Sequence, residues 1–396
     1  MQKIPIAYVI DRSFTERDFN RYGVSELAKK FNFYIVDLSG IVHKSSNKDD
    51  DFISQNSNLY FEQLHCFDNV EALKDFLSKN LILYYIDLMG VDSSCSKIRQ
   101  VLKYKNIKRI KFYLGELPQL HSATNFFSRL KSAILKGNFF NKAFNYLYRK
   151  FFIQINEPQI DISVYSGNIC KERFVEENKK IIWAHALDYE VYLNRVEQAK
   201  PERIKNYAVF LDQNAPFHPD YTFHNNRAPV KASNYFKSLN AFFDDIEEIT
   251  GLEIIIASHP RTTINNDFWG DRKSISENTP ELVQHANLVL AHYSTAISFA
   301  VLWGKPILQL TTNEYINSYR HDRFLAFASA LDLNLLNTDN YKKENLKKED
   351  LFEVNKVLYK NYEDLYLRSD NAKRDRLWSI VSDEIYSHYA SQSGNV

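Results

Sequence analysis

Several features that would narrow the function are scarce in this sequence. It has only ten glycines, ten prolines and three cysteines in 396 residues. Long disordered or collagen-like segments are therefore not expected, and the scattered Cys66, Cys95 and Cys170, with no CxxC pair, indicate a reducing compartment and no structural zinc. A formal net charge of +1 argues against a whole-protein nucleic-acid binder, because neutralising phosphates needs a basic face.

Long apolar runs are also missing. The apolar stretch in the opening MQKIPIAYVIDR is too short for a signal peptide before Asp11 and Arg12 arrive. No run of about 18 apolar residues is present, so no transmembrane helix is expected. The sequence therefore predicts a cytoplasmic protein.

The first part of the chain alternates strand and helix patterns. Buried strands are predicted at IPIAYVID, NFYIVDLSG, LILYYIDLMG and IKRIKFYLG, with helical stretches between them. Continuous apolar strands separated by helices predict a parallel sheet covered on both faces, and hence a Rossmann-like domain over residues 1–200. No GxGxxG follows the first strand, so a dinucleotide fingerprint is missing.

A second α/β pattern follows the polar stretch EQAKPERIKN. It covers residues 205–330, with strands at YAVFLDQ, LEIIIASHP, NLVLAHYS and KPILQLT. Its clearest helix is SNYFKSLNAFFDDIEEIT, which we expect to end at Gly251. Residues 331–396 are charged and predicted to be helical. The fold class expected is α/β, with two Rossmann-like domains facing a cleft and a helical C-terminal tail.

One segment of the first part has an unusual composition. Residues 117–156 contain no acidic side chain, and they interleave lysines and arginines with phenylalanines and tyrosines. Basic helices with aromatic faces favour anionic membrane surfaces. A helical hairpin packed on the first domain explains the pattern equally well. The protein could therefore lie at the inner face of the cytoplasmic membrane.

Polar clusters follow three strands of the second part. They are Asp212-Gln213-Asn214, Ser258-His259-Pro260-Arg261 and His292-Tyr293-Ser294-Thr295. Ligands of open α/β sheets bind at the carboxyl ends of the strands. We therefore expect the three clusters to converge on one rim.

Each cluster has a specific chemistry and a plain structural alternative. Ser294 and Thr295 start a helix, where free N–H groups attract an anion, although Ser294 could simply cap that helix. His259 could donate to a phosphate, with Pro260 holding its turn. The fork of Arg261 suits phosphate or carboxylate, and an isolated surface ion pair would explain it too. Gln213 and Tyr293 are further candidates at this rim, with Gln213 as the nearest residue of its loop to a bound ligand.

The combination resembles a known family. Residues Tyr207 to Leu310 resemble the donor-binding domain of GT-B-fold glycosyltransferases, most closely the bacterial sialyltransferases and Kdo transferases, which use CMP-activated acidic sugars. Those families carry an HP motif after one strand and a Ser/Thr pair at a later helix. The resemblance implies that His259-Pro260 and Ser294-Thr295 bind the nucleotide phosphate region. It also implies a nucleotide sugar and a glycan or glycolipid acceptor as partners, with no cofactor and no metal.

Glycosyl transfer with inversion needs a base for the acceptor hydroxyl. Asp188, after the strand KKIIWA, is the first candidate, and Asp11, at the tip of the first strand, is the second. Asp188 could equally cap a helix. Nearby side chains form a predicted acceptor site, namely His185, Arg17 and Arg21.

Three functions remain in competition at this point. The first is a glycosyltransferase that moves Kdo or a nonulosonic acid, such as sialic, pseudaminic or legionaminic acid, onto a bacterial surface glycan. The second is a sugar-nucleotide epimerase or hydrolase of GT-B-like fold, with a CDP-glycerol-type phosphotransferase as a neighbouring possibility. The third is a non-catalytic scaffold at a membrane surface with a degenerate nucleotide site.

Overall fold

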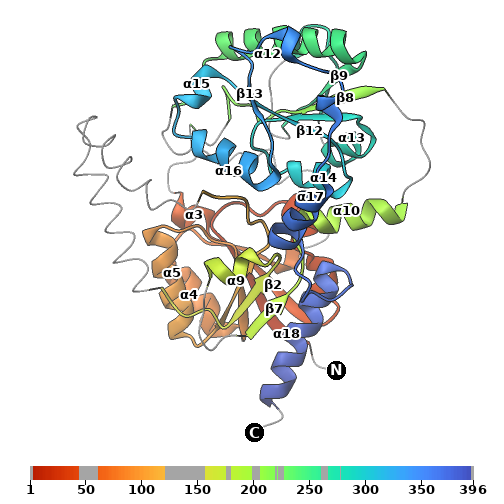
Figure 1. The fold of residues 1–396 in the computed structure, drawn as a ribbon. Coiled ribbons are helices and arrows are strands. Elements are labelled where there is room, and N and C mark those ends of the chain that lie inside the picture. The colour runs from red at the N-terminus through yellow and green to blue at the C-terminus, as the bar shows by residue number, and fades with distance from the viewer. Residues whose placement is uncertain are drawn as a thin grey trace.

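The computed structural model of the protein describes residues 3–43, 61–120, 157–174, 180–198, 206–218, 221, 227–259, 266–276 and 278–393. Two parallel sheets organise this chain, one above the other in Figure 1. The predicted α/β class, with two Rossmann-like domains and a helical C-terminal segment, is confirmed. The predicted basic segment lies largely outside the described residues, and Pro260 and Arg261 lie outside them as well.

The first sheet has seven strands in the order β3-β2-β1-β4-β5-β6-β7. They are β1 (Ile4–Ile10), β2 (Phe31–Asp37), β3 (Leu64–Cys66), β4 (Tyr84–Asp87), β5 (Lys108–Tyr113), β6 (Ile162–Tyr165) and β7 (Lys180–Trp183). The helices between them are α1 (Glu16–Arg21), α2 (Val24–Leu27), α3 (Ser39–Val42), α4 (Val70–Lys79), α5 (Ser93–Tyr104), α9 (Ile169–Arg173) and α10 (Leu187–Gln198).

Both faces of this sheet are covered, and β1 shows why its sequence is almost wholly apolar. Ile6 and Tyr8 point into one hydrophobic cluster, whereas Ala7 and Val9 point into the cluster on the opposite face. Alternate residues of a strand face opposite sides of the sheet, so a strand buried on both sides needs an unbroken apolar run.

The second sheet has six strands in the order β10-β9-β8-β11-β12-β13. They are β8 (Tyr207–Leu211), β9 (Glu253–Ala257), β10 (Ser274–Ile275), β11 (Leu288–Ala291), β12 (Ile307–Thr311) and β13 (Leu335–Asn337). The main helices around them are α12 (Ala232–Thr250), α13 (Thr279–His285), α14 (Ile297–Leu302), α15 (Asn313–Ile316) and α16 (His321–Leu331). Gly251 ends α12 with a left-handed φ of 72°, as predicted.

The C-terminal part of the chain returns from the second domain to the first. It comprises α17 (Lys356–Tyr362), η8 (Glu363–Leu367) and α18 (Leu377–Ser393). The η8 segment passes so close to Gly167 that a Cβ there would lie 2.1 Å from the Leu365 carbonyl oxygen. Trp378 of α18 then packs on Gly23 of the first domain, where a Cβ would lie 2.0 Å from the indole. Both glycines are therefore required by close approach.

Helices also fill the space between the sheets. Figure 1 shows α10, α14 and α17 between the two domains, and α10 contacts α14 directly. Among the described residues, no helix combines the length and apolarity that crossing a membrane would require.

Candidate active site between the two sheets

The loops after β8, β9 and β11 meet at one edge of the second sheet, as their positions in sequence predicted. We call this edge the second rim (residues 212–214, 258–259 and 292–295). Gln213 Nε2 donates a hydrogen bond to the Tyr293 carbonyl oxygen at 3.3 Å. The Asp212 carboxylate accepts backbone hydrogen bonds from Asn214, at 2.9 Å, and from His259. Three clusters distant in sequence therefore form one continuous surface.

Asp212 supports the second rim from below. Burial raises the pKa of this carboxyl to about 6, although backbone N–H groups of three residues lower it in part. Because the carboxylate receives these N–H groups, it fixes the loop after β8 against the loop after β9. We read Asp212 as a positioning residue for His259.

His292 is the second buried support, and it is neutral. Its Nδ1 lies 2.7 Å from the Leu310 carbonyl oxygen, and its Nε2 lies 2.9 Å from the Tyr235 hydroxyl. A carbonyl can only accept, so Nδ1 carries the proton and Nε2 accepts from the tyrosine. Burial lowers the pKa of the imidazole to about 4. This histidine therefore holds the rim and does not bind an anion as a cation.

Ser294 and Thr295 lie in the turn before α14. Ser294 Oγ accepts from the Ala296 backbone N–H at 3.2 Å, but Ala296 is the N-cap residue and no side chain caps the helix. Thr295 is exposed at the start of the α14 turn. The helix itself begins only at Ile297, three residues later than the sequence pattern indicated. The Ser294 hydroxyl proton and the exposed Thr295 hydroxyl are the polar groups that this turn presents.

His259 lies at the tip of β9 with its side chain half-buried. Its ring centroid is 4.9 Å from that of His218, in an edge-on arrangement. His218 belongs to the loop after β8, so the predicted histidine is held by a neighbouring tip. The residues that follow it in this loop, 260–265, lie outside the described range.

Two arginines next to the second rim were missed by the sequence reasoning. The Arg323 guanidinium lies 5.9 Å from the ring centroid of Tyr293, and both Arg320 and Arg323 act electrostatically on that phenol. Within the part of the chain that the structure describes, neither forms an ion pair with a carboxylate. Their signal in the sequence is the basic stretch SYRHDR, which follows β12 and α15 and does not lie at a strand tip.

The first sheet carries a cavity of about 220 Å³ at the carboxyl ends of β4 and β5. We call its wall the first rim (residues 87–89, 111–112, 114–115 and 187, with Arg21 and Tyr22 from the end of α1). The predicted acceptor residue Arg21 lines this cavity. Leu187, also in the wall, is the first residue of α10 and directly precedes Asp188.

A buried charge network forms the floor of the first rim. Asp87, 2% exposed, bonds to Arg99 Nε at 2.8 Å and to Arg109 Nη2 at 2.6 Å. Glu157 pairs with the same two arginines at 3.1 and 3.0 Å. Burial alone would raise the pKa of Asp87, but Lys111 and the arginines hold it below its ordinary value.

Asp188, the predicted base, lies where the two domains meet. It is the second residue of α10, and a hydrogen bond with Ser298 links it to α14 of the second domain. Burial raises the pKa of this carboxyl to about 6, against a smaller lowering by Arg21 and by Ser298. A carboxylate with a pKa near the working pH is suited to general base catalysis.

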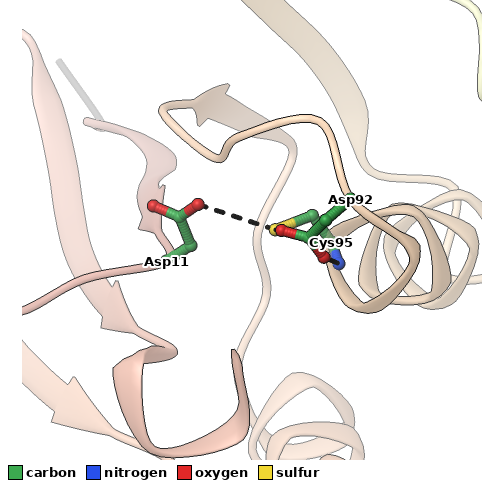
Figure 2. A group of neighbouring side chains, drawn as sticks. All are labelled: Asp11, Asp92 and Cys95. Atoms are coloured by element: carbon green, nitrogen blue, oxygen red, sulfur yellow. Dashed lines mark hydrogen bonds between the residues drawn. The ribbon is translucent and has the colours of Figure 1, made fainter. Parts of the chain in front are cut away.

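Asp11, the second candidate base, is held in a different environment (Figure 2). Its Oδ2 accepts from the Gly90 N–H at 2.7 Å and lies 3.6 Å from Cys95 Sγ. Asp92 caps α5 and accepts from the Cys95 thiol at 3.1 Å. Burial and the two carboxylates raise the pKa of that thiol, whereas a metal needs the thiolate. These contacts are those of a helix cap and a loop anchor.

The other two predicted acceptor residues, Arg17 and His185, differ in their exposure. Arg17 is exposed on α1. His185 is fully buried, and its Nε2 lies 2.8 Å from Glu190 Oε2. Glu190 also accepts from the backbone N–H of Leu377, at the start of α18. In this structure His185 therefore secures the returning C-terminal segment, and the prediction that it contacts an acceptor is corrected on the ground of its burial.

Solved structures resemble the whole chain. CalG4, the calicheamicin glycosyltransferase, is 11% identical with a TM-score of 0.55, over 99% of both chains. The UDP-GlcNAc 2-epimerase of Methanocaldococcus jannaschii is 13% identical with a TM-score of 0.52, over 97% of this chain and 100% of that one. Another UDP-N-acetylglucosamine 2-epimerase is 12% identical with a TM-score of 0.52, over 99% and 97%.

No protein-family model matches the chain, and no curated protein matches its sequence. The structural likenesses therefore establish the fold, the GT-B arrangement of two Rossmann-like domains. The narrower resemblance to sialyltransferases and Kdo transferases stays a prediction.

Proposed function

We propose that the protein is a glycosyltransferase that uses a nucleotide-activated sugar, with the donor on the second rim and the acceptor on the first. The observation that carries the proposal is the position of Asp188. It places a carboxyl of raised pKa, on the first domain, in contact with α14, the helix that follows Ser294 and Thr295. A base beside both rims is what transfer between a donor and an acceptor needs.

The second rim suits the phosphate part of the donor. The exposed Thr295 hydroxyl and the half-buried His259 imidazole lie on it, and Arg320 and Arg323 stand beside it without acidic partners among the described residues. Arginine forks bind phosphate oxygens in two-pronged fashion. The same cations would stabilise the phosphate as it leaves the sugar.

The proposed chemistry is a simple displacement. The Asp188 carboxylate takes the proton of an acceptor hydroxyl as its oxygen forms a bond to the anomeric carbon. The bond between that carbon and the phosphate oxygen breaks, and the nucleotide departs with the electron pair. The proton leaves Asp188 to solvent afterwards. Arg21, which lowers the pKa of Asp188, keeps a share of the carboxyl ionised near neutral pH.

The finer identity of the donor comes from the sequence. The HP and Ser-Thr motifs favour a CMP-activated acidic sugar, Kdo or a nonulosonic acid, and an acceptor on a growing bacterial surface glycan at the inner membrane face. The solved 2-epimerases of the same fold are described as enzymes of UDP-GlcNAc. CMP and UDP are therefore the two nucleotides to compare first.

Isothermal titration with CMP, UDP and GDP tests the donor site. We expect one of them to bind, and His259→Ala to weaken it by about tenfold or more, because it removes one polar contact to phosphate. Lys103→Gln, an exposed change on α5, is the control and should bind like the wild type. The assignment fails if none of the three nucleotides binds, or if His259→Ala binds unchanged.

An epimerase is the second candidate, favoured by the likeness to two 2-epimerases at a TM-score of 0.52. Incubation with the sugar nucleotide alone separates the two functions. Conversion of the donor at enzymatic rates without an acceptor would support the epimerase, whereas conversion that requires an acceptor supports transfer.

A further inference from the structure

The cavity of the first rim is too small for a whole nucleotide sugar. Its volume is about 220 Å³, whereas sites that enclose a complete small ligand have roughly 300–1,000 Å³. Its volume therefore suits one chemical group of a larger substrate, and Leu187 and Arg21 are part of its lining.

The charges around this cavity do not cancel. Asp87 and Glu157 are matched by Arg99 and Arg109, so these four side chains sum to zero. Lys111 is then an additional cation, with its Nζ 3.9 Å from Asp87 Oδ2 and 3.3 Å from the Asp87 carbonyl oxygen. Desolvation lowers the pKa of Lys111, and its side chain is 22% exposed, so water compensates its charge only in part.

Arg21 adds a second cation at the mouth. Within the described residues its contacts are the ring of Tyr22, 5.9 Å away, and the field of Asp188. The acid that lines the cavity, Asp87, is already shared by two arginines. A neutral or cationic guest would therefore leave Lys111 uncompensated, whereas an anion would complete the balance.

We propose that this cavity binds an anionic group of the acceptor, a carboxylate or a phosphate, with Lys111 as its main cation and Arg21 at its mouth. That the guest belongs to the acceptor rests on the proposed function, whereas the binding of an anion does not. Carboxylate and phosphate share the same recognition chemistry here, namely negatively charged oxygens near an ammonium and a guanidinium.

Binding of three small sugars to the full chain tests the proposal. The probes are glucuronate, glucose 1-phosphate and uncharged glucose, titrated by calorimetry or ligand-observed NMR. We expect at least one charged sugar to bind ten or more times as tightly as glucose. The charged sugar that binds best tells a carboxylate acceptor from a phosphate acceptor. Lys111→Gln should abolish this preference, and the exposed Arg21→Gln should reduce it about threefold without touching the core.

Matched variants keep the outcomes separate. Lys103→Gln removes an exposed charge elsewhere and should keep the preference, as should His259→Ala on the second rim. The proposal is overturned if glucose binds as well as the charged sugars, if Lys111→Gln keeps the preference, or if His259→Ala removes it. Nucleotide titration of the same proteins is the separate readout: lost nucleotide binding with an intact sugar preference would count against the proposed function alone.

Discussion

The two rims are stabilised by opposite means. In the first rim, buried carboxylates and guanidinium groups compensate one another, with Asp87 bonded to Arg99 and Arg109. In the second, the buried groups are the neutral imidazole of His292 with the Tyr235 phenol, among aromatic rings, and the Asp212 carboxyl, which backbone N–H groups satisfy. A floor with buried cations can leave one of them over for a guest, whereas a floor without cations leaves anion binding to the side chains at its surface.

This contrast explains why one sheet suits the acceptor and the other the nucleotide. A support without buried cations changes little when a phosphate binds above it, because no cation is drawn from its partner. The first rim has an excess ammonium, Lys111, inside a cavity. Substitutions that change each kind of support separately test this contrast.

The largest effect is expected at Asp188, between the rims. Asp188→Asn should lower kcat by about 10²–10⁴, because the acceptor hydroxyl loses its base, while nucleotide affinity stays unchanged. The folded pKa of Asp188 is raised, so its ionised form costs stability as pH rises from 3.8 through about 6. The variant should therefore be at least as stable as wild type at pH 7.5.

Turnover measured with the donor that binds, together with urea unfolding, checks this expectation. Asp271→Asn, which changes an exposed aspartate of the second domain, is the matched control and should turn over normally. A threefold or smaller loss in Asp188→Asn would remove Asp188 from the mechanism.

The charged support comes next. Asp87→Ala should cost about 3–5 kcal/mol in the free energy of unfolding, because it leaves two buried guanidinium groups short of a partner. Asp75→Ala, which breaks an exposed pair with Lys79, should cost less than about 1 kcal/mol. Equal losses in urea denaturation would show that the network of the first rim does not matter.

The support by His292 should make the free energy of unfolding depend on pH. The folded pKa of His292 lies at about 4, below the 6.5 of an unfolded histidine. The contribution of neutral His292 to the free energy of unfolding is therefore present above pH 6.5 and is lost as pH falls towards 4. The full loss is ~3 kcal/mol. The stability difference between wild type and His292→Gln should shrink by most of this amount from pH 7.5 to 4.5.

The first rim provides the counterpart to this experiment. The pKa of Asp87 is lowered below 3.8, so its contribution persists at pH 4.5. The difference between wild type and Asp87→Ala should accordingly stay constant over the same interval. A shrinking difference for Asp87, or a constant one for His292, would contradict the distinction between the rims.

The smallest effect is expected at the hydrogen bond that joins two tips of the second rim. Gln213→Ala removes the contact with the Tyr293 carbonyl and should cost about 0.5–1.5 kcal/mol. Because the predicted nucleotide site includes Gln213, the loss in the free energy of nucleotide binding should exceed the loss in the free energy of unfolding. Thermal unfolding with and without nucleotide measures both, and an unchanged affinity would place Gln213 outside the site.

The sequence was sufficient for the fold because its signals are local. Apolar runs alternating with helices predicted most strands of both sheets, and Gly251 marked the end of α12. The strand β13 was not expected, because residues 331–396 were predicted to be helical. Polar clusters after three strands predicted the second rim, since neighbouring parallel strands end at the same edge. The alternative that Ser294 caps α14 is wrong, because the N-cap residue is Ala296 and no side chain caps this helix.

The sequence was not sufficient where partners are distant in the chain. The network around Asp87 joins residues from β4, α5, β5 and the segment before β6. No spacing rule links these positions, although single charged residues within apolar strands were a signal. The return of α18 onto the first domain, and with it the burial of His185, depends on packing that periodicity does not encode.

A crystal structure of the protein soaked with the nucleotide that binds best is the most direct test of the central claim. We expect electron density for the phosphate at the second rim, within hydrogen-bonding distance of His259 and Thr295. We expect no density for the nucleotide in the cavity of the first rim. Density for the nucleotide in the first-rim cavity, beside Lys111, would contradict the assignment of the two rims.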